Sequence, residues 1–203
     1  MIYFDDLLKS DNIDYAVSQI AKDFRSKHQF PEVRQLGVIV ADVEIAAVEL
    51  EEKGIGPFFI ASDTLKFWNE RGENRTFSGK LGVACHKGYE IELLEPGVGS
   101  TFYKTCVDEK GRMVVQHLGF LVNDVDAHTR ELEKAGCSTW VRGKIKSFPI
   151  VTNFAYMDTV EQAGIILEFI DMRFLGFAVK VPGGIYHSLG RMEKMIGIRS
   201  LSF

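Results

Sequence analysis

The sequence predicts an α+β fold built from two copies of one β-α-β-β-β unit. Residues 35–54 align without gaps with residues 117–136, and 9 of the 20 aligned positions are identical. Each copy opens with the alternating pattern of a strand and continues into the apolar stripe of a helix. An internal repeat of this quality indicates that one supersecondary unit was doubled.

The first unit is predicted to span residues 34–96. Leu36, Val38 and Val40 share one face of its opening strand. Asp42 then follows as the expected N-cap of a helix that ends at Gly54. Three more strands are predicted after this helix, at about 57–68, 76–85 and 89–95.

The second unit is predicted to span residues 114–171, after a linker at 97–113. It repeats the order of the first unit, with Asp124 as the expected N-cap of its helix. The predicted elements are a strand at 115–122, a helix at 125–135, and strands near 138–147, 152–158 and 164–170.

Two segments lie outside the repeat. Residues 1–33 have apolar residues at roughly helical spacing, which predicts a lead-in of one or two short helices. Residues 172–203 form a C-terminal extension that is too apolar to be left in water. We expect this extension to pack on the domain or on a second subunit.

Composition excludes several classes of function. The net charge of −4, without a basic block, argues against nucleic acid as a partner. The apolar runs are too short for a membrane span, and the acidic start is unlike a secretory signal. Three widely spaced cysteines without a C-x-x-C pair fit a reducing compartment, so the expected location is the cytoplasm.

Gln35 and His117 are equivalent positions of the repeat and are the first candidates for a site. Each opens a strand, and each is followed two residues later by a glycine on the same face, Gly37 and Gly119. A glycine there removes side-chain bulk and leaves room for something else beside the polar side chain.

Glu92 and Glu168 are the other two candidates. Each lies near the end of the last strand of its unit, with apolar residues around it. A buried, ionised carboxylate without a partner costs several kcal/mol, so a cation or a hydrogen-bond donor is implied. Glu90 shares a strand face with Glu92 and remains an alternative to it.

These residues carry a resemblance to a known group of proteins. The pattern His/Gln-x-Gly-x-x-Val-x-Asp at the start of a unit, with Glu-Leu-Leu-Glu-Pro at its end, resembles the vicinal oxygen chelate superfamily. That superfamily includes glyoxalase I, methylmalonyl-CoA epimerase, extradiol dioxygenases and bleomycin-resistance proteins. The resemblance covers about residues 34–171, which is most of the chain.

The resemblance implies an open, cup-like sheet of eight strands around one divalent metal ion. It places the ligands on the first and last strands of each unit, at Gln35, Glu92, His117 and Glu168. Three oxygens and one imidazole suit zinc, nickel, cobalt or manganese. Such an ion polarises a carbonyl, so that a carboxylate can remove a neighbouring C–H proton. Glu168 is the expected base, with Glu92 as its counterpart.

The function implied is that of a metal-dependent lyase, isomerase or epimerase acting on a small carbonyl or thioester substrate. One alternative is a metal-free binding protein of the bleomycin-resistance kind. A second is an iron ring-cleavage dioxygenase, which is disfavoured because it needs two histidine ligands. Arg71, Arg75 and Arg112 are candidates for clamping a substrate anion. A homodimer is plausible, since paired units in this superfamily exchange between subunits.

Overall fold

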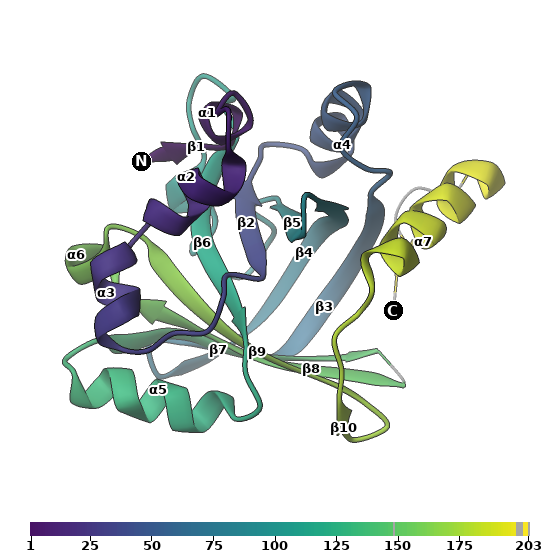
Figure 1. Cartoon of the computed structure of the whole chain (residues 1–203). Helices are drawn as coiled ribbons and strands as arrows, with labels where there is room; N and C mark the ends of the chain where they lie inside the picture. The colour runs from purple at the N-terminus through teal and green to yellow at the C-terminus, as the bar shows by residue number, and fades with distance from the viewer. Residues whose placement is uncertain (148, 198–200, 203) are drawn as a thin grey trace.

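The computed structural model describes residues 1–147, 149–197 and 201–202, and it confirms the predicted α+β class. Two β-α-β-β-β modules share one sheet, and most of the helices cover its outer surface (Figure 1). The first module consists of β2 (Gln35–Ile39), α4 (Val43–Glu52), β3 (Phe59–Glu70), β4 (Glu73–His86) and β5 (Tyr89–Leu94).

The second module repeats this order after a linker that holds one short 3-10 helix, η1 (Lys104–Cys106). A short helix that the sequence pattern did not indicate, α6, separates its last two strands. The elements are β6 (Val114–Leu121), α5 (Val125–Lys134), β7 (Ser138–Ser147), β8 (Ile150–Asp158), α6 (Val160–Ala163) and β9 (Ile166–Phe174).

Both predicted helix caps are confirmed. The Asp42 carboxylate accepts a hydrogen bond of 3.0 Å from the backbone N–H of Ile45 at the start of α4. The Asp124 carboxylate accepts one of 2.9 Å from the N–H of Ala127 at the start of α5. Each cap pairs a backbone donor that has no partner within its own helix.

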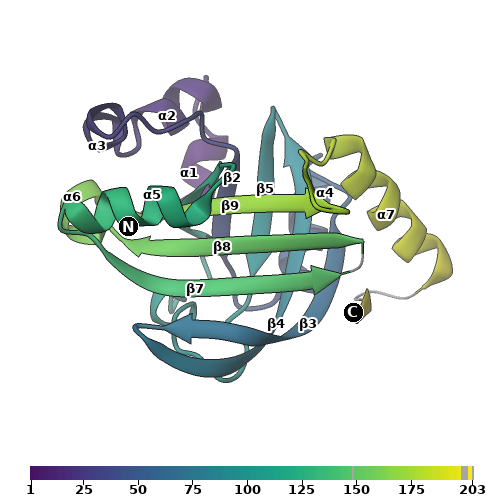
Figure 2. The same cartoon turned by 90° about the horizontal axis from the view of Figure 1, so that it is seen from below.

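The opening strands of the two modules lie side by side at the centre of the sheet. β2 runs antiparallel to β6, while β5 pairs parallel with β2 and β9 pairs parallel with β6. β4 and β3 continue outward from β5, and β8 and β7 continue outward from β9. The outermost strands β3 and β7 then pair with each other from Phe67 and Lys144 to Glu70 and Val141. The cup predicted as open is therefore closed on this side into a barrel-like ring (Figure 2).

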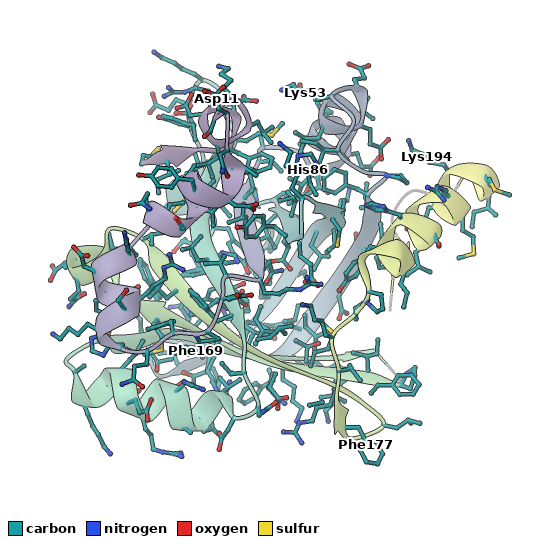
Figure 3. The ribbon with its side chains drawn as sticks, viewed as in Figure 1. Asp11, Lys53, His86, Phe169, Phe177 and Lys194 are labelled. Atoms are coloured by element: carbon teal, nitrogen blue, oxygen red, sulfur yellow. The ribbon has the colours of Figure 1, made fainter. Side chains whose placement is uncertain are left out.

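Two apolar clusters fill the space on either side of the sheet. The outer cluster holds the buried faces of α4 and α5 together with the N-terminal helices. It includes Phe169, which lies between β9 and α5 and stacks on Phe30 with ring centroids 5.3 Å apart (Figure 3). The inner cluster is rich in aromatic rings and includes Trp68, Phe77 and Phe154. β2 and β6 are buried on both faces, which explains why apolar residues lie on both faces of these strands.

The lead-in contains three short helices, where one or two were predicted, and a short strand at the edge of the sheet. These are β1 (Ile2–Tyr3), α1 (Phe4–Leu8), α2 (Ile13–Gln19) and α3 (Lys22–Lys27). The C-terminal extension contains β10 (Phe177–Ala178), α7 (Gly183–Ile196) and β11 (Leu201–Ser202). As predicted, it packs on the domain: α7 lies against β3 and β4 (Figure 1). None of the helices in the described ranges has the length and apolar character needed to cross a bilayer.

Candidate metal centre

The pairing register of the central strands places one residue from each module in the same row of the sheet. Gly37 of β2 lies opposite His117 of β6, and Glu92 of β5 lies on the other side of Gly37. Residues paired across a sheet point to the same face, so Glu92 and His117 both project into the cup.

The next row repeats the arrangement with the modules exchanged. Gln35 of β2 lies opposite Gly119 of β6, and Glu168 of β9 lies on the other side of Gly119. In each row a glycine separates two polar side chains. The internal repeat of the sequence therefore places equivalent side chains from the two modules on one shared face of the sheet.

Three of the four predicted ligands come together inside the cup. One ligand atom from each of Glu92, His117 and Glu168 lies within 4.8 Å of the other two. Nε2 of His117 is 3.2 Å from Oε2 of Glu168 and 3.7 Å from Oε2 of Glu92. Separations of this size suit side chains that share one bound cation.

The donor atoms at this point have no hydrogen-bond partner within the described part of the chain. Oε1 of Gln35, Nε2 of His117 and Oε2 of Glu168 are all buried without a hydrogen bond, and the ion pair between Nε2 and Oε2 forms only when the imidazole is protonated. Leaving such atoms unsatisfied costs about 1–3 kcal/mol each, and more for a charged group. A divalent cation bound by Glu92, His117 and Glu168 would satisfy the histidine and Glu168 atoms together, so these residues fit a metal ion. Gln35, the fourth predicted ligand, is a neutral amide in the neighbouring row of the sheet, opposite Gly119.

The room beside the two glycines is filled by the opposite module. The imidazole of His117 lies over Gly37, and the side chain of Gln35 lies over Gly119. The sequence pattern indicated that each glycine makes room next to the polar residue of its own strand. The structure shows instead that each glycine accommodates the polar residue of the neighbouring strand.

Gln116 orients the histidine ring. The register between β2 and β6 shifts after the Gly37–His117 pair, because Val38 pairs with Val115 and Gln116 is the extra residue of a β-bulge. Oε1 of Gln116 accepts from Nδ1 of His117 at 3.2 Å, while its amide nitrogen donates to the carbonyl of Phe102 at 3.3 Å. A proton held on Nδ1 leaves Nε2 to face the carboxylates.

The electrostatics of the metal-free site follow from burial and close opposite charges. Burial lowers the pKa of His117, but Glu168 and Glu92 outweigh it and raise that pKa to about 9. Burial raises the pKa of Glu168, and the charge of His117 offsets this only in part. Without a cation, a protonated imidazole therefore offsets one of the two carboxylate charges, with Glu168 as its closer partner.

A cavity of about 490 Å³ opens over the site. Gln35, Glu92 and Glu168 line its floor, and two buried tyrosines stand beside them. The hydroxyls of Tyr103 and Tyr156 are 3.0 Å apart, and Tyr156 is paired across the sheet with Glu168. Burial raises the pKa of both phenols, so both remain neutral hydrogen-bond donors.

The predicted anion clamps lie away from this cavity. Arg71 donates to Asp158 at 2.9 Å, Arg75 donates to Glu73 at 3.0 Å, and Arg112 donates to Asp108 at 2.8 Å. None of the three arginines is among the residues that line the cavity. They sit in exposed loops and strand ends, where a nearby carboxylate is the more favourable partner.

Glu90, the alternative to Glu92, has a different partner. Its carboxylate accepts from Nη2 of Arg34 at 2.8 Å. Glu90 lies one row away from His117, opposite Gln35 on β2. The charge of Glu90 is therefore already balanced, whereas Glu92 faces the histidine.

No family model matches this chain, and no curated protein matches it. Solved structures do match it. Methylmalonyl-CoA epimerase from Mycobacterium tuberculosis is 17% identical, with a TM-score of 0.46 over 68% of this chain and 85% of the epimerase. A variant of the Streptomyces coelicolor methylmalonyl-CoA epimerase, in complex with 2-nitronate-propionyl-CoA, is 14% identical. Its TM-score is 0.47, over 75% of this chain and 99% of the epimerase. A mutant of 4-hydroxymandelate synthase from Streptomyces coelicolor is 15% identical, with a TM-score of 0.49 over 82% of this chain and 56% of the synthase.

The paired β-α-β-β-β modules around one inner face are the arrangement that the sequence resemblance to the vicinal oxygen chelate superfamily implied. At these identities the likeness to vicinal oxygen chelate proteins concerns the fold, and the chemistry has to be read from the site.

Several residues at this site were not predicted from the sequence. Gln116 directly precedes His117, but a β-bulge leaves no mark in an apolar alternation. Tyr103 lies in the linker. Tyr156 lies in a strand with several aromatic residues, whose sequence pattern indicates a core strand. The sequence contains no pattern that indicates which hydroxyl groups lie near the glutamates at the strand ends.

Proposed function

We propose that this chain is a metal-dependent enzyme of the glyoxalase type, a lyase, isomerase or epimerase. Gln35, Glu92, His117 and Glu168 would hold one divalent ion, and the substrate would be a small carbonyl compound or thioester. The observation that carries the proposal is the convergence of Glu92, His117 and Glu168 within 4.8 Å, with buried atoms of His117 and Glu168 that make no hydrogen bond.

The donor set indicates which ion fits. Two carboxylates, one amide oxygen and one imidazole, without a thiolate, suit zinc, nickel, cobalt or manganese. When bound, such an ion acts as a Lewis acid that makes a C–H bond next to a coordinated carbonyl more acidic.

Glu168 is the residue we assign as the base. Its Oε2 is buried, has no hydrogen-bond partner and lines the floor of the cavity. Burial raises the pKa of its carboxyl group. A higher pKa makes a carboxylate a stronger proton acceptor and brings it closer to the pH at which it can also release the proton. The proton taken from the substrate would reside on the carboxylate oxygen of Glu168 that does not hold the ion.

Glu92 has a different environment and is assigned a second role. Its side chain is 15% exposed at the cavity, whereas that of Glu168 is 5% exposed. Glu92 is the more exposed of the two carboxylates, and we assign it as the ligand that stays on the ion while Glu168 takes the proton. In an epimerase, Glu92 would instead be the group that returns a proton to the opposite face of the substrate carbon.

The experiment is solvent deuterium exchange at the carbon next to the carbonyl, followed by proton NMR. Protein loaded with Mn²⁺ or Zn²⁺ is offered 1,2-diketones, α-hydroxyketones and acyl thioesters in D₂O. We expect exchange of at least one compound by the wild type, and a loss of about 10²–10⁴-fold in Glu168→Gln, as for removal of a general base. Exchange that is equally fast in Glu168→Gln, or in protein treated with EDTA, would refute the proposal.

A metal-free binding protein is the second candidate. The protonated His117 offsets one of the two carboxylate charges without any ion, and the cavity above is large enough for a small molecule. This candidate predicts tight ligand binding that EDTA does not change. The dioxygenase alternative lacks a second histidine, since His117 is the one histidine that the structure places in the cluster.

A further inference from the structure

The cavity above the metal centre identifies the chemical class of substrate. At about 490 Å³ it lies within the range of roughly 300–1,000 Å³ typical of small-molecule sites. Both modules supply its walls, mostly with aromatic and aliphatic side chains such as Leu65, Trp68, Phe77, Ile145 and Phe154. The apolar body of a ligand would therefore be surrounded by apolar side chains on most sides.

The C-terminal extension completes this wall. Val181, Ile185, Tyr186 and Leu189, from α7 and the segment before it, line the same cavity. Three of these four side chains are apolar, so these four residues add no cation to the cavity wall. Ile185 is 48% exposed, which places it at the rim.

Specific contacts hold α7 in this position. Oε2 of Glu193 accepts from the backbone N–H of Ile60 at 2.9 Å. Gly190 packs so closely on β3 that a Cβ there would lie 2.5 Å from the carbonyl oxygen of Phe58. This wall is therefore a fixed part of the fold.

Among the described residues that line the cavity, no lysine or arginine is free to pair with an anionic group. Lys80 is the one lysine or arginine among the lining residues, and its Nζ lies 2.7 Å from the carboxylate of Glu44. The carboxylates that line the cavity belong to Asp63, Glu90, Glu92, Glu95 and Glu168.

The positive charges that touch these carboxylates have a counterpart, and Lys180 adds one further positive charge near Glu90. Arg34 balances Glu90, and a divalent ion would be balanced by Glu92 and Glu168. Asp63 and Glu95 remain, so the loaded cavity would be neutral to negative. A carboxylate or phosphate entering it would lose its hydration without gaining an ion pair.

We propose that the substrate is an uncharged, largely apolar molecule that presents two adjacent oxygens, and that it is not a polyanion such as a CoA thioester. The inference of two adjacent oxygens rests on the proposed metal function. The inference of a neutral, apolar body rests on the cavity alone.

The test compares matched pairs of probes. 1-Phenyl-1,2-propanedione and phenylpyruvate share a phenyl ring and adjacent oxygens, and only phenylpyruvate is charged. S-propionyl-N-acetylcysteamine and propionyl-CoA share the reacting thioester, and only propionyl-CoA carries phosphates. Binding is followed by the fluorescence of Trp68, which lines the cavity, in a Trp140→Phe background. The two tryptophans of the chain are Trp68 and Trp140, so this background leaves one reporter.

We expect each neutral probe to bind at least tenfold more tightly than its charged partner, with and without Mn²⁺. Ile185→Lys adds a cation at the rim and should reduce the preference severalfold. Met195→Lys is the matched control, because Met195 is on the same helix, is 86% exposed and does not line the cavity. It should leave the preference unchanged.

Equal or tighter binding of phenylpyruvate or propionyl-CoA would overturn the inference, as would failure of both neutral probes to bind at millimolar concentration. Mn²⁺ binding is measured separately by calorimetry. A chain that binds no metal but keeps the neutral preference would refute the proposed function and leave the neutral apolar ligand in place.

Discussion

The imidazole of His117 occupies the space that a side chain at Gly37 would need. A Cβ built on Gly37 would lie 1.8 Å from Cε1 and 2.0 Å from Nε2 of the ring. The relationship is repeated with the modules exchanged, since a Cβ on Gly119 would lie 2.7 Å from Oε1 of Gln35. The glycines of the two opening strands therefore set the positions of the two central polar side chains.

Substituting Gly37 tests this relationship. Gly37→Ala should destabilise the protein by about 3 kcal/mol, because the buried ring has to move out of a packed interior. It should also lower the affinity for Mn²⁺ at least tenfold. The double variant Gly37→Ala/His117→Ala removes the clash, and its destabilisation should be smaller than the sum of the single effects by about 2 kcal/mol. Urea denaturation measures both quantities. Additive effects would show that the ring and the glycine are not coupled.

Gln116 is expected to act on metal affinity through His117. Gln116→Ala removes the side-chain oxygen that accepts a hydrogen bond from Nδ1 of His117. It should weaken Mn²⁺ binding by about 10–100-fold, as for other partners of ligating histidines. Gln116→Glu keeps an acceptor oxygen and should recover most of the affinity. Calorimetric titration of the three proteins provides the comparison. Equal losses in both variants would mean that the side chain acts only by packing.

The stability of the metal-free protein should fall as the pH rises. The folded-state pKa of His117 is about 9, above its ordinary 6.5. The contribution of protonated His117 to the free energy of unfolding is therefore complete below pH 6.5. It is lost as the pH rises to about 9, by up to roughly 3 kcal/mol. The raised pKa of Glu168 acts in the same direction, beginning near its ordinary 4.5.

Urea unfolding in EDTA across this range measures the effect. His117→Gln should flatten the curve between pH 6.5 and 9, and saturating Mn²⁺ should reverse the loss, because the ion competes with the proton for Nε2. A metal-free wild type that is equally stable at both limits would contradict the assigned charge state.

The attachment of α7 can be tested with two identical substitutions on one helix. Gly190→Ala places a Cβ 2.5 Å from the carbonyl oxygen of Phe58, whereas a Cβ at Gly184 meets nothing within 4 Å. Gly190→Ala should loosen α7, speed limited proteolysis of the C-terminal extension and weaken binding of neutral probes severalfold. Gly184→Ala should change none of these. Identical behaviour of the two variants would show that α7 does not form part of the cavity wall.

The repeat and its caps were readable in the sequence because they depend on local patterns. The β-α-β-β-β order and the capping roles of Asp42 and Asp124 follow from alternation, helical periodicity and N-cap chemistry. The positions of Glu92 and Glu168 at strand ends were also visible, since a lone carboxylate in an apolar strand stands out.

The features that the sequence did not reveal depend on contacts between distant segments. The pairing of Phe67 with Lys144 closes the cup, and no local pattern specifies which strands meet there. The exchange of the two polar residues across β2 and β6 depends on register, which is shifted by the bulge at Gln116. Loop residues such as Arg71 form ion pairs outside the cavity. A loop has no periodic sequence pattern, so the sequence does not indicate which residues its side chains contact.

The most direct test of the account is the stoichiometry of metal binding, measured by calorimetry with Mn²⁺ on wild type, His117→Ala and Glu168→Gln. We expect one ion per wild-type chain, no detectable binding by His117→Ala, and markedly weaker binding by Glu168→Gln. A wild type that binds no divalent ion, or variants that bind it as tightly as the wild type, would contradict the claim that these side chains form one metal centre.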